Sequence, residues 1–322
     1  MELYPLKFTP ILKERLWGGT RLGTDLDKPV QGDRVGESWE LSGVPGDVSV
    51  VANGPYRGRT LEELIAAYPK ALLGNAVLAR FGTDFPILIK FIDAREDLSI
   101  QLHPGDELAR KRHSSFGKTE MWYIMGADPG SELIIGFNRD VSRKEYQEAL
   151  DSGRLLELLN YEPVGEGDTF FINSGKIHAI GGGILLAEIQ QSSDVTYRVY
   201  DFDRRDAGGN LRELHTDMAL DAMDYNKRDD FRIDYNRKKN RENTMVDSAY
   251  FRTSYLELDT SLTREFHSQE SFRAYVCVGG SASLELGTHS VPIQRGETVL
   301  VPAAAAGLRI VTGKCRLLEV TL

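Results

Sequence analysis

The stretch Gly167-Asp-Thr-Phe-Phe-Ile-Asn-Ser-Gly-Lys-Ile-His178 decides the fold, because a related stretch recurs near the end of the chain. It can be laid without a gap over Gly296-Glu-Thr-Val-Leu-Val-Pro-Ala-Ala-Ala-Ala-Gly307, where the glycine, the acid, the threonine and three apolar residues match. Each copy has the composition of a short strand followed by a turn. The match predicts two related β-units, although a glycine, an acid and a threonine before apolar residues is also a common strand start.

The sequence around these two copies consists mostly of short strand-like runs separated by Gly, Asn, Asp and Pro. Clear examples are "PILIKFIDA" (86–94), "EMWYIMG" (120–126) and "ILLAEIQ" (184–190). The chain is therefore expected to be mainly β, with two β-units of which the first carries added helices.

Helical periodicity occurs in a few places only. Residues 60–82 and 142–160 each begin with Thr or Ser three residues before Glu, which is the spacing of a capping box. Residues 214–229 predict a further short helical piece.

A charged segment, 226–243, has mixed signs and few apolar residues, which predicts an exposed connection, although its "FRIDY" centre could form a strand. We therefore expect a catalytic domain with helical insertions over 1–240 and a degenerate C-terminal β-domain over 241–322.

Composition excludes several function classes. The chain has 322 residues, 41% of them hydrophobic, and a formal net charge of −9, which argues against general affinity for nucleic acid or for an anionic membrane. Residues 1–25 contain no apolar core of a signal peptide, and no run approaches 18 apolar residues. Cys277 and Cys315 could pair, but two reduced, buried thiols fit this chain better. We expect a soluble cytoplasmic protein.

Four residues could hold a metal ion. Gln101 and His103 stand two apart in "SIQLHP", so on a strand they point to the same face. Glu120 closes "FGKTE", and His178 ends the repeated stretch. Two imidazoles, a carboxylate and an amide oxygen are a plausible ligand set for Zn²⁺ or a similar divalent ion. Each histidine taken alone would more often be a structural residue.

The two repeated stretches resemble the second motif of the cupin superfamily, G-x5-P-x-G-x2-H. The first stretch fits this motif except at Asn173, and the second keeps Pro302 but has Gly307 in place of the histidine. The first cupin motif, H-x-H-x3-4-E, is altered too, since Gln101 replaces its first histidine and Glu120 comes late. The resemblance implies two jelly-roll units, of which only the first binds metal.

These departures point to one branch of the superfamily. "LWGG", "GESWELSG", "SIQLHP", "GKTEMWY", "GKIHAIGGG" and "EIQQSSDVTYRVYD" together resemble type I mannose-6-phosphate isomerase in its short bacterial form. The resemblance implies one zinc ion per chain, bound by Gln101, His103, Glu120 and His178. It also implies interconversion of mannose 6-phosphate and fructose 6-phosphate through an enediol(ate), with a small-molecule sugar phosphate as the partner.

Three residues match the candidates that the family offers for catalysis: Lys118, Asp194 and Arg198. Lys118 would share a strand face with Glu120, and a nearby dication would lower its pKa so that it could shuttle protons. Arg198 could stabilise the enediolate or bind the phosphate, and Asp194 could relay a proton or orient Arg198. The alternatives are a solvated surface lysine and a structural Asp–Arg ion pair.

The substrate pocket is expected to include Lys90, which stands within an apolar strand and must either reach a cavity or pay a burial cost. It could bind the phosphate there, and the alternative is a snorkelling residue at a sheet edge. Trp17, Trp39 and Glu40 are expected to wall the same pocket, although aromatic residues are as often part of a core.

The chain also departs from the longer family members. Gly117 stands where they have a histidine before the lysine, and the separate helical domain of the longer members is missing. The alternatives to an isomerase are a non-catalytic sugar-phosphate-binding cupin and another metal-dependent cupin enzyme, such as an iron-dependent oxygenase. A monomer or a homodimer is expected.

Overall fold

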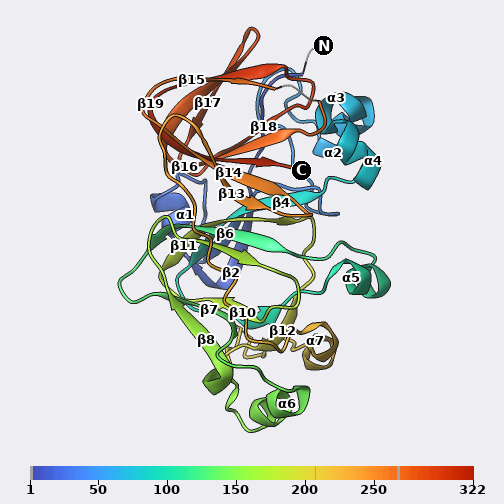
Figure 1. Cartoon of the computed structure of the whole chain (residues 1–322), viewed down its shortest axis with the longest axis vertical. Helices are drawn as coiled ribbons and strands as arrows, with labels where there is room; N and C mark the ends of the chain where they lie inside the picture. Colours follow the sequence, from blue (N-terminus) through green and yellow to red (C-terminus); the bar gives the residue numbers. More distant parts are fainter. Residues whose placement is uncertain (1–2, 207, 267–268) are drawn as a thin grey trace.

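The computed structural model describes residues 3–206, 208–266 and 269–322, and it is built mainly of antiparallel β-sheet (Figure 1). The strands form a five-stranded, a six-stranded and an eight-stranded sheet. The predicted mainly β fold class with two β-units is confirmed.

The first unit contains two facing sheets. The six-stranded sheet has the order β2 (Ile11–Gly19), β3 (Val35–Leu41), β4 (Ile87–Ala94), β11 (Ile184–Gln191), β6 (Glu120–Ala127) and β9 (Thr169–Ile172). The five-stranded sheet has the order β12 (Tyr197–Tyr200), β5 (Ile100–Leu102), β10 (His178–Ile180), β7 (Glu132–Phe137) and β8 (Leu159–Pro163). Ile92 and Trp122 from the first sheet share one core cluster with Ile135 and Ile180 from the second, as in a jelly roll.

The second unit is the eight-stranded sheet, which Figure 1 shows in orange and red at one end of the molecule. Its main path is β1 (Leu6–Lys7), β18 (Thr298–Val301), β16 (Arg273–Leu286), β19 (Gly307–Thr321), β14 (Arg252–Leu258) and β13 (Glu242–Asp247), with β15 (Leu262–Glu265) on β19 and β17 (His289–Gln294) on β16. Apolar side chains fill its interior, and Cys277 and Cys315 are buried there as free thiols, as predicted. Because β1 pairs with β18, the start of the chain joins this unit. The domain division at residue 240 stays a prediction.

The central strands of the six-stranded sheet contribute side chains to the interiors of both units. Successive side chains point to opposite faces, so Ile89 of β4 and Ala187 of β11 share a core cluster with Ala274 and Leu318 of the second unit. The side chains between them point the other way, into the first unit. This alternation places charged residues of otherwise apolar strands inside that unit.

The helices lie at the margins of the sheets (Figure 1). They are α1 (Arg21–Thr24), α2 (Leu61–Ala67), α3 (Pro69–Leu73), α4 (Asn75–Phe81), α5 (Asp106–His113), α6 (Arg143–Asp151), the 3-10 helix η1 (Leu155–Leu158) and α7 (Thr216–Ala222). The predicted helical stretch 60–82 is present but broken into three, because Pro69 starts a new helix and Gly74 adopts φ 93° between α3 and α4. The short helices α1 and α5 were not predicted.

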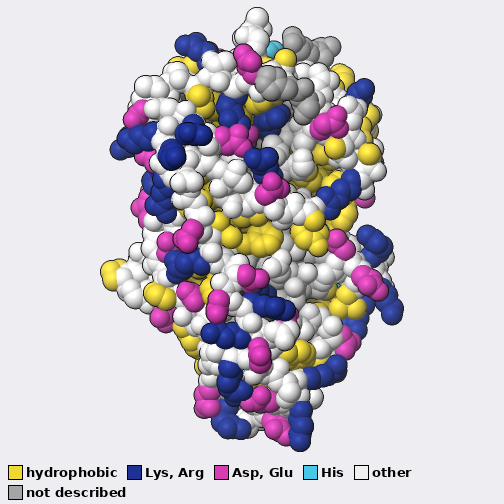
Figure 2. All heavy atoms as spheres, in the orientation of Figure 1, with side chains coloured by type: hydrophobic (Ala, Val, Ile, Leu, Met, Phe, Trp, Pro, Cys, Tyr) yellow, Lys and Arg dark blue, Asp and Glu magenta, His cyan; other side chains and the backbone are white. Residues whose placement is uncertain are grey.

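The surface in Figure 2 carries Lys and Arg interspersed with Asp and Glu, without a face of one sign on the side shown. In the described part of the chain, no helix is long and apolar enough to cross a membrane. The charged segment 226–243 is mostly exposed as predicted, but Phe231 anchors it in the core and Arg232 bridges to Phe170.

Candidate active site

One wall of the site is a row of four side chains across the six-stranded sheet. The strand register pairs Trp39 of β3 with Lys90 of β4, Lys90 with Glu188 of β11, and Glu188 with Trp122 of β6. Residues paired directly across strands project to the same face. Two opposite charges flanked by two indoles therefore face the interior of the first unit.

The other wall is a row across the five-stranded sheet. The register pairs Arg198 of β12 with Gln101 of β5, and Gln101 with His178 of β10. His103 follows Gln101 by two residues and so lies on the same face, as predicted. The two rows bring together residues as distant in sequence as Trp39 and Arg198.

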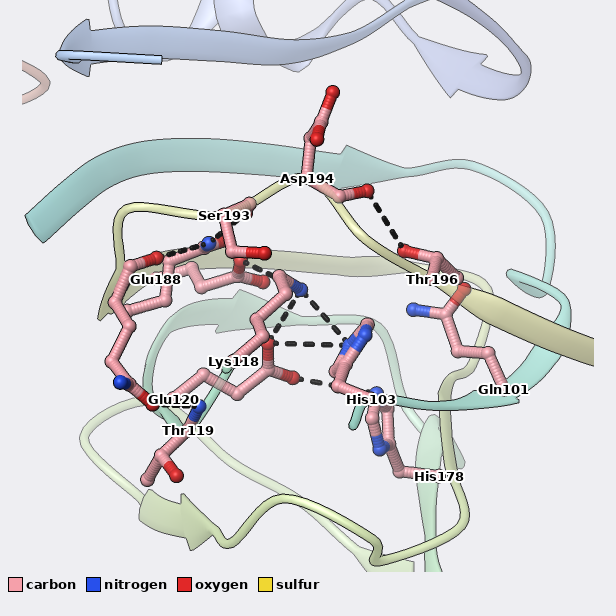
Figure 3. A network of polar contacts seen from close by, with 12 residues as sticks. Gln101, His103, Lys118, Thr119, Glu120, His178, Glu188, Ser193, Asp194 and Thr196 are labelled. Carbon is pink, nitrogen blue, oxygen red and sulfur yellow. Dashed lines mark hydrogen bonds and ion pairs between the residues drawn. The ribbon is translucent and has the colours of Figure 1, made fainter. Parts of the chain in front are cut away.

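Three predicted metal ligands meet between these rows: His103, Glu120 and His178. Each offers a ligand atom, and these atoms lie within 4.8 Å of one another (Figure 3). His103 Nε2 is 3.5 Å from Glu120 Oε2, and His178 Nε2 is 3.4 Å from Glu120 Oε1. All three side chains are 1% exposed.

Hydrogen bonds fix the tautomer and the orientation of both imidazoles. Nδ1 of His103 lies 2.9 Å from the carbonyl of Val195, and Nδ1 of His178 lies 2.8 Å from the carbonyl of Lys176. Since a carbonyl only accepts, each Nδ1 carries the proton and each Nε2 keeps its lone pair. Nε2 of His178 is buried without a hydrogen-bond partner. The lone pair of His103 and the carboxylate of Glu120 are contacted by Lys118, whereas the lone pair of His178 has no donor among the described residues. A cation bound between the three side chains would satisfy all of them.

The ionisation of these groups agrees with this arrangement. Burial, and then the nearby charge of Lys118, lower the pKa of His103 well below its usual range and that of His178 to about 4. Burial raises the pKa of Glu120 to about 7, helped by Glu188 and opposed by Lys118. Neutral imidazoles are the form that binds metal, so both histidines are ready ligands at neutral pH.

Gln101, the fourth predicted ligand, lines the cavity next to this cluster. Its Oε1 accepts a hydrogen bond from the hydroxyl of Ser99 at 3.2 Å, and Figure 3 shows its amide on the side of the two histidines. A ligand role would require the amide oxygen to turn from Ser99 toward the three-residue cluster.

Lys118 lies against the cluster. Its Nζ is 2.7 Å from Glu120 Oε2, 2.9 Å from His103 Nε2 and 3.7 Å from Glu188 Oε1. Burial opposes the charged form, but Glu120 and Glu188 outweigh it and raise the pKa of Lys118. Lys118 is therefore a buried ammonium group and not a solvated surface lysine. Without a metal ion, its pKa is raised rather than lowered.

Lys90 forms the centre of the charged wall. Its Nζ is 2.9 Å from Glu188 Oε1, and it lies 5.5 Å from the ring centre of Trp39. Glu188 also accepts from Trp122 Nε1 at 3.2 Å, and both charged side chains are less than a tenth exposed.

A cavity of about 630 Å³ has Lys118 and Gln101 in its lining. Of the residues expected to wall it, Trp17, Trp39 and Lys90 line it, and Glu40 does not. Glu40 points to the opposite face of β3, where its carboxylate accepts from Lys28 at 2.7 Å and from Ser38 at 2.6 Å. The alternation of β3 places Glu37 in the cavity wall instead.

Asp194 and Arg198 both line the cavity but make no contact with each other in the described structure. Arg198 donates to Ser99 Oγ at 3.3 Å and to the carbonyl of Glu213 at 2.8 Å. The carboxylate of Asp194 is exposed and points away from Lys118 and the histidines (Figure 3). The alternative of a structural Asp–Arg ion pair is not what the structure shows.

Gly117 has a steric explanation. A Cβ at this position would lie 2.7 Å from the backbone nitrogen of Asp106 and 2.9 Å from its Oδ1. The Gly117 amide donates to the same Oδ1 at 2.8 Å, which also accepts from Gln191. The start of α5 therefore fills the space that a histidine side chain would need, and it braces the segment that carries Lys118.

The charged cavity residues that escaped sequence reasoning include Glu37, Glu188 and Arg212. For Glu188 a signal was present, since it is a single acid inside the apolar run "ILLAEIQ", as Lys90 is a single lysine inside "PILIKFIDA". Two lone opposite charges in neighbouring apolar strands indicate a buried pair. No such signal marks Arg212, which stands in a polar loop.

Comparisons with known proteins agree with this geometry. Residues 6–129 match the family model for phosphomannose isomerase type I, catalytic domain, and residues 241–322 match that for mannose-6-phosphate isomerase, cupin domain. Mannose-6-phosphate isomerase ManA of Bacillus subtilis is 36% identical, with 94% of each chain covered. The chain belongs to the type I phosphomannose isomerase family.

Further matches cover nearly the whole chain of this family member. Mannose-6-phosphate isomerase of Streptococcus mutans is 34% identical, with 92% of each chain covered. The crystal structure of the mannose 6-phosphate isomerase from Bacillus subtilis superposes with a TM-score of 0.89 at 33% identity, covering 99% of this chain and all of that one. The predicted family and the prediction of an enzyme, an isomerase of this family, are confirmed.

Proposed function

We propose that this phosphomannose isomerase family member interconverts mannose 6-phosphate and fructose 6-phosphate with one zinc ion held by Gln101, His103, Glu120 and His178. The observation that carries the metal assignment is the buried meeting of two neutral imidazoles and one carboxylate, with Nε2 of His178 unpartnered. When bound there, a zinc ion supplies Lewis-acid polarisation of a substrate oxygen.

The reaction moves a proton between C2 and C1 of the open-chain sugar, through an enediol(ate) whose negative charge must be stabilised. Lys118 is the proposed proton carrier, because its Nζ reaches both the ligand cluster and the cavity. Lys118 would share His103 and Glu120 with a cation held there. The charge of such a cation would oppose that of the ammonium group and would lower the pKa of Lys118 toward the range useful for proton transfer.

Side chains that line the cavity have the remaining roles in the proposed mechanism. Arg198 is half-buried and keeps its positive charge in the cavity, where it stabilises an oxyanion or a phosphate. Asp194, exposed on the same rim, relays a proton to solvent. Lys90 and the indoles of Trp17 and Trp39 shape the pocket around the sugar.

The reaction is tested by a coupled assay for fructose 6-phosphate formed from mannose 6-phosphate on zinc-loaded protein, with unphosphorylated mannose as the control substrate. Turnover of mannose 6-phosphate with little turnover of mannose supports the proposal. Turnover of neither sugar by metal-loaded protein would contradict it.

A further inference from the structure

The chain after β12 turns back and returns beside that strand. Arg205 forms a bridge with Leu211, and the amide of His215 donates to the carbonyl of Arg198 at 2.7 Å. This return places Arg212 next to β12 and in the lining of the cavity. A residue outside every quoted motif therefore lines the cavity.

Asp201, at the end of β12, organises the arginines around it. Its carboxylate accepts from Arg212 Nε at 2.6 Å, is bonded to Arg212 Nη2 as well, and accepts from Arg204 at 2.6 Å. Two parallel bonds to one carboxylate fix the plane of the Arg212 guanidinium. Burial, and then the charge of Arg212, lower the pKa of Arg198, so the two guanidinium groups are close enough to repel each other.

The other cationic side chains of the cavity each have a carboxylate close by. Lys13 pairs with Asp47, Arg15 with Glu37, Lys90 with Glu188 and Lys118 with Glu120, each as an ion pair. Arg198 has no carboxylate within 4.0 Å among the described residues, and Asp201 must serve Arg204 and Arg212 together. Unbalanced positive charge in the cavity is therefore concentrated at Arg198 and Arg212.

Both arginines, which line the cavity, also keep donors free. Arg198 uses Nε and Nη1 for Ser99 and for the carbonyl of Glu213, and Arg212 uses Nε and Nη2 for Asp201. In the described part of the chain, neither Arg198 Nη2 nor Arg212 Nη1 has an acceptor. A half-buried guanidinium with a free donor and a cationic neighbour is a site for a multiply charged anion.

We propose that Arg198 and Arg212 form the subsite for the phosphate group of the substrate, with Asp201 as the positioning residue that holds the Arg212 guanidinium in place. This inference rests on the proposed function in taking the substrate to be a sugar phosphate. The phosphate lies at the β12 end of the cavity, and the sugar extends from there toward Lys118 and the metal ligands.

The test measures binding of inorganic phosphate by calorimetry and, separately, kcat and KM for mannose 6-phosphate, on zinc-loaded protein. In Arg212→Gln we expect phosphate affinity to fall at least about tenfold and KM to rise about 10- to 100-fold, with kcat within about threefold of wild type. The matched control is Arg205→Gln, because Arg205 lies in the same turn, is exposed, and among the described residues its side chain bonds only the carbonyl of Gly209. It should change neither quantity.

Two further variants distinguish the effect of the position of the Arg212 guanidinium from the effect of its charge. Asp201→Asn frees the Arg212 guanidinium, so it should raise KM and weaken phosphate binding by a smaller factor than Arg212→Gln. Arg212→Lys keeps the charge but loses the two-pronged geometry of the guanidinium. Its KM and phosphate affinity should lie between those of wild type and Arg212→Gln. Unchanged phosphate affinity in Arg212→Gln, or no phosphate binding by wild type, would overturn the subsite. So would a loss of kcat alone, which would place Arg212 in the chemical step. Arg212-dependent phosphate binding without isomerase turnover would uphold the subsite and refute the proposed function.

Discussion

Lys90 and Glu188 face each other directly across β4 and β11, with Nζ 2.9 Å from Oε1. Both are buried, and Glu188 also lies 3.7 Å from Lys118. The two opposite charges neutralise each other, which allows both side chains to be buried in otherwise apolar strands. The pair also places the Glu188 carboxylate near the proposed proton carrier, Lys118.

This pair should dominate local stability. Lys90→Met leaves Glu188 buried without its main partner, so we expect the free energy of unfolding to fall by about 3–5 kcal/mol. The double variant Lys90→Met with Glu188→Gln removes both charges and should lose less than the sum of the two single changes. Urea denaturation at pH 7 measures both.

The control for that comparison is Lys144→Met, since Lys144 is 85% exposed and its ion pair with Glu148 lies on the surface of α6. It should stay within about 0.5 kcal/mol of wild type. Strict additivity of the two buried changes would show that Lys90 and Glu188 are not coupled.

Lys118 should matter for chemistry rather than for metal binding. We expect Lys118→Met to lower kcat by about 10²- to 10⁴-fold, because it removes the proposed proton carrier, while zinc content stays near one per chain. Steady-state kinetics and metal analysis of the same preparation test this. Lys111→Met, at an exposed position on α5, is the control. A Lys118 variant with normal kcat would remove this residue from the mechanism.

Glu37 should make stability depend on pH. Burial opposes its ionisation, but Lys90 and Arg15 outweigh burial and lower its pKa from 4.5 to about 2. A carboxylate whose pKa is lower in the folded than in the unfolded state stabilises the fold at pH values above the unfolded-state pKa. This stabilisation is lost as the pH falls through the folded-state pKa. The ionised group therefore contributes about 3 kcal/mol at pH 7, and this contribution declines between pH 4.5 and pH 2.

The comparison uses Glu37→Gln and wild type, both stripped of metal, in denaturation curves at pH 7, 5, 4 and 3. The free energy of unfolding should fall less steeply below pH 5 in the variant than in wild type. Parallel pH profiles would mean that the Glu37 carboxylate has a nearly normal pKa.

Sequence reasoning reached the residues of the candidate metal site because local patterns mark them. Gln101 and His103 share a face by strand periodicity, and His178 ends a recognisable turn. The fold class followed from the repeated stretch around His178 for the same reason. Glu40 was placed in the pocket wrongly, since a strand with every residue buried gives no polar–apolar alternation to tell its two faces apart, and the face of β3 that meets the cavity carries Glu37.

Other features depend on tertiary pairing alone. The contact of Glu188 with both lysines follows from the register of β11 with β4 and from the position of Lys118 before β6. Arg212 reaches the cavity only because the chain after β12 folds back onto that strand. Nothing in the local sequence encodes that return, so neither residue could be assigned a role beforehand.

The most direct test of the central claim is reconstitution. Protein stripped with a chelator should have no measurable isomerase activity on mannose 6-phosphate, and activity should rise linearly with added Zn²⁺ up to one ion per chain. His178→Ala should bind far less zinc and stay inactive, whereas His289→Ala, in the second unit, should behave as wild type. Full activity in metal-free protein, or one tightly bound zinc per chain in His178→Ala, would contradict the account.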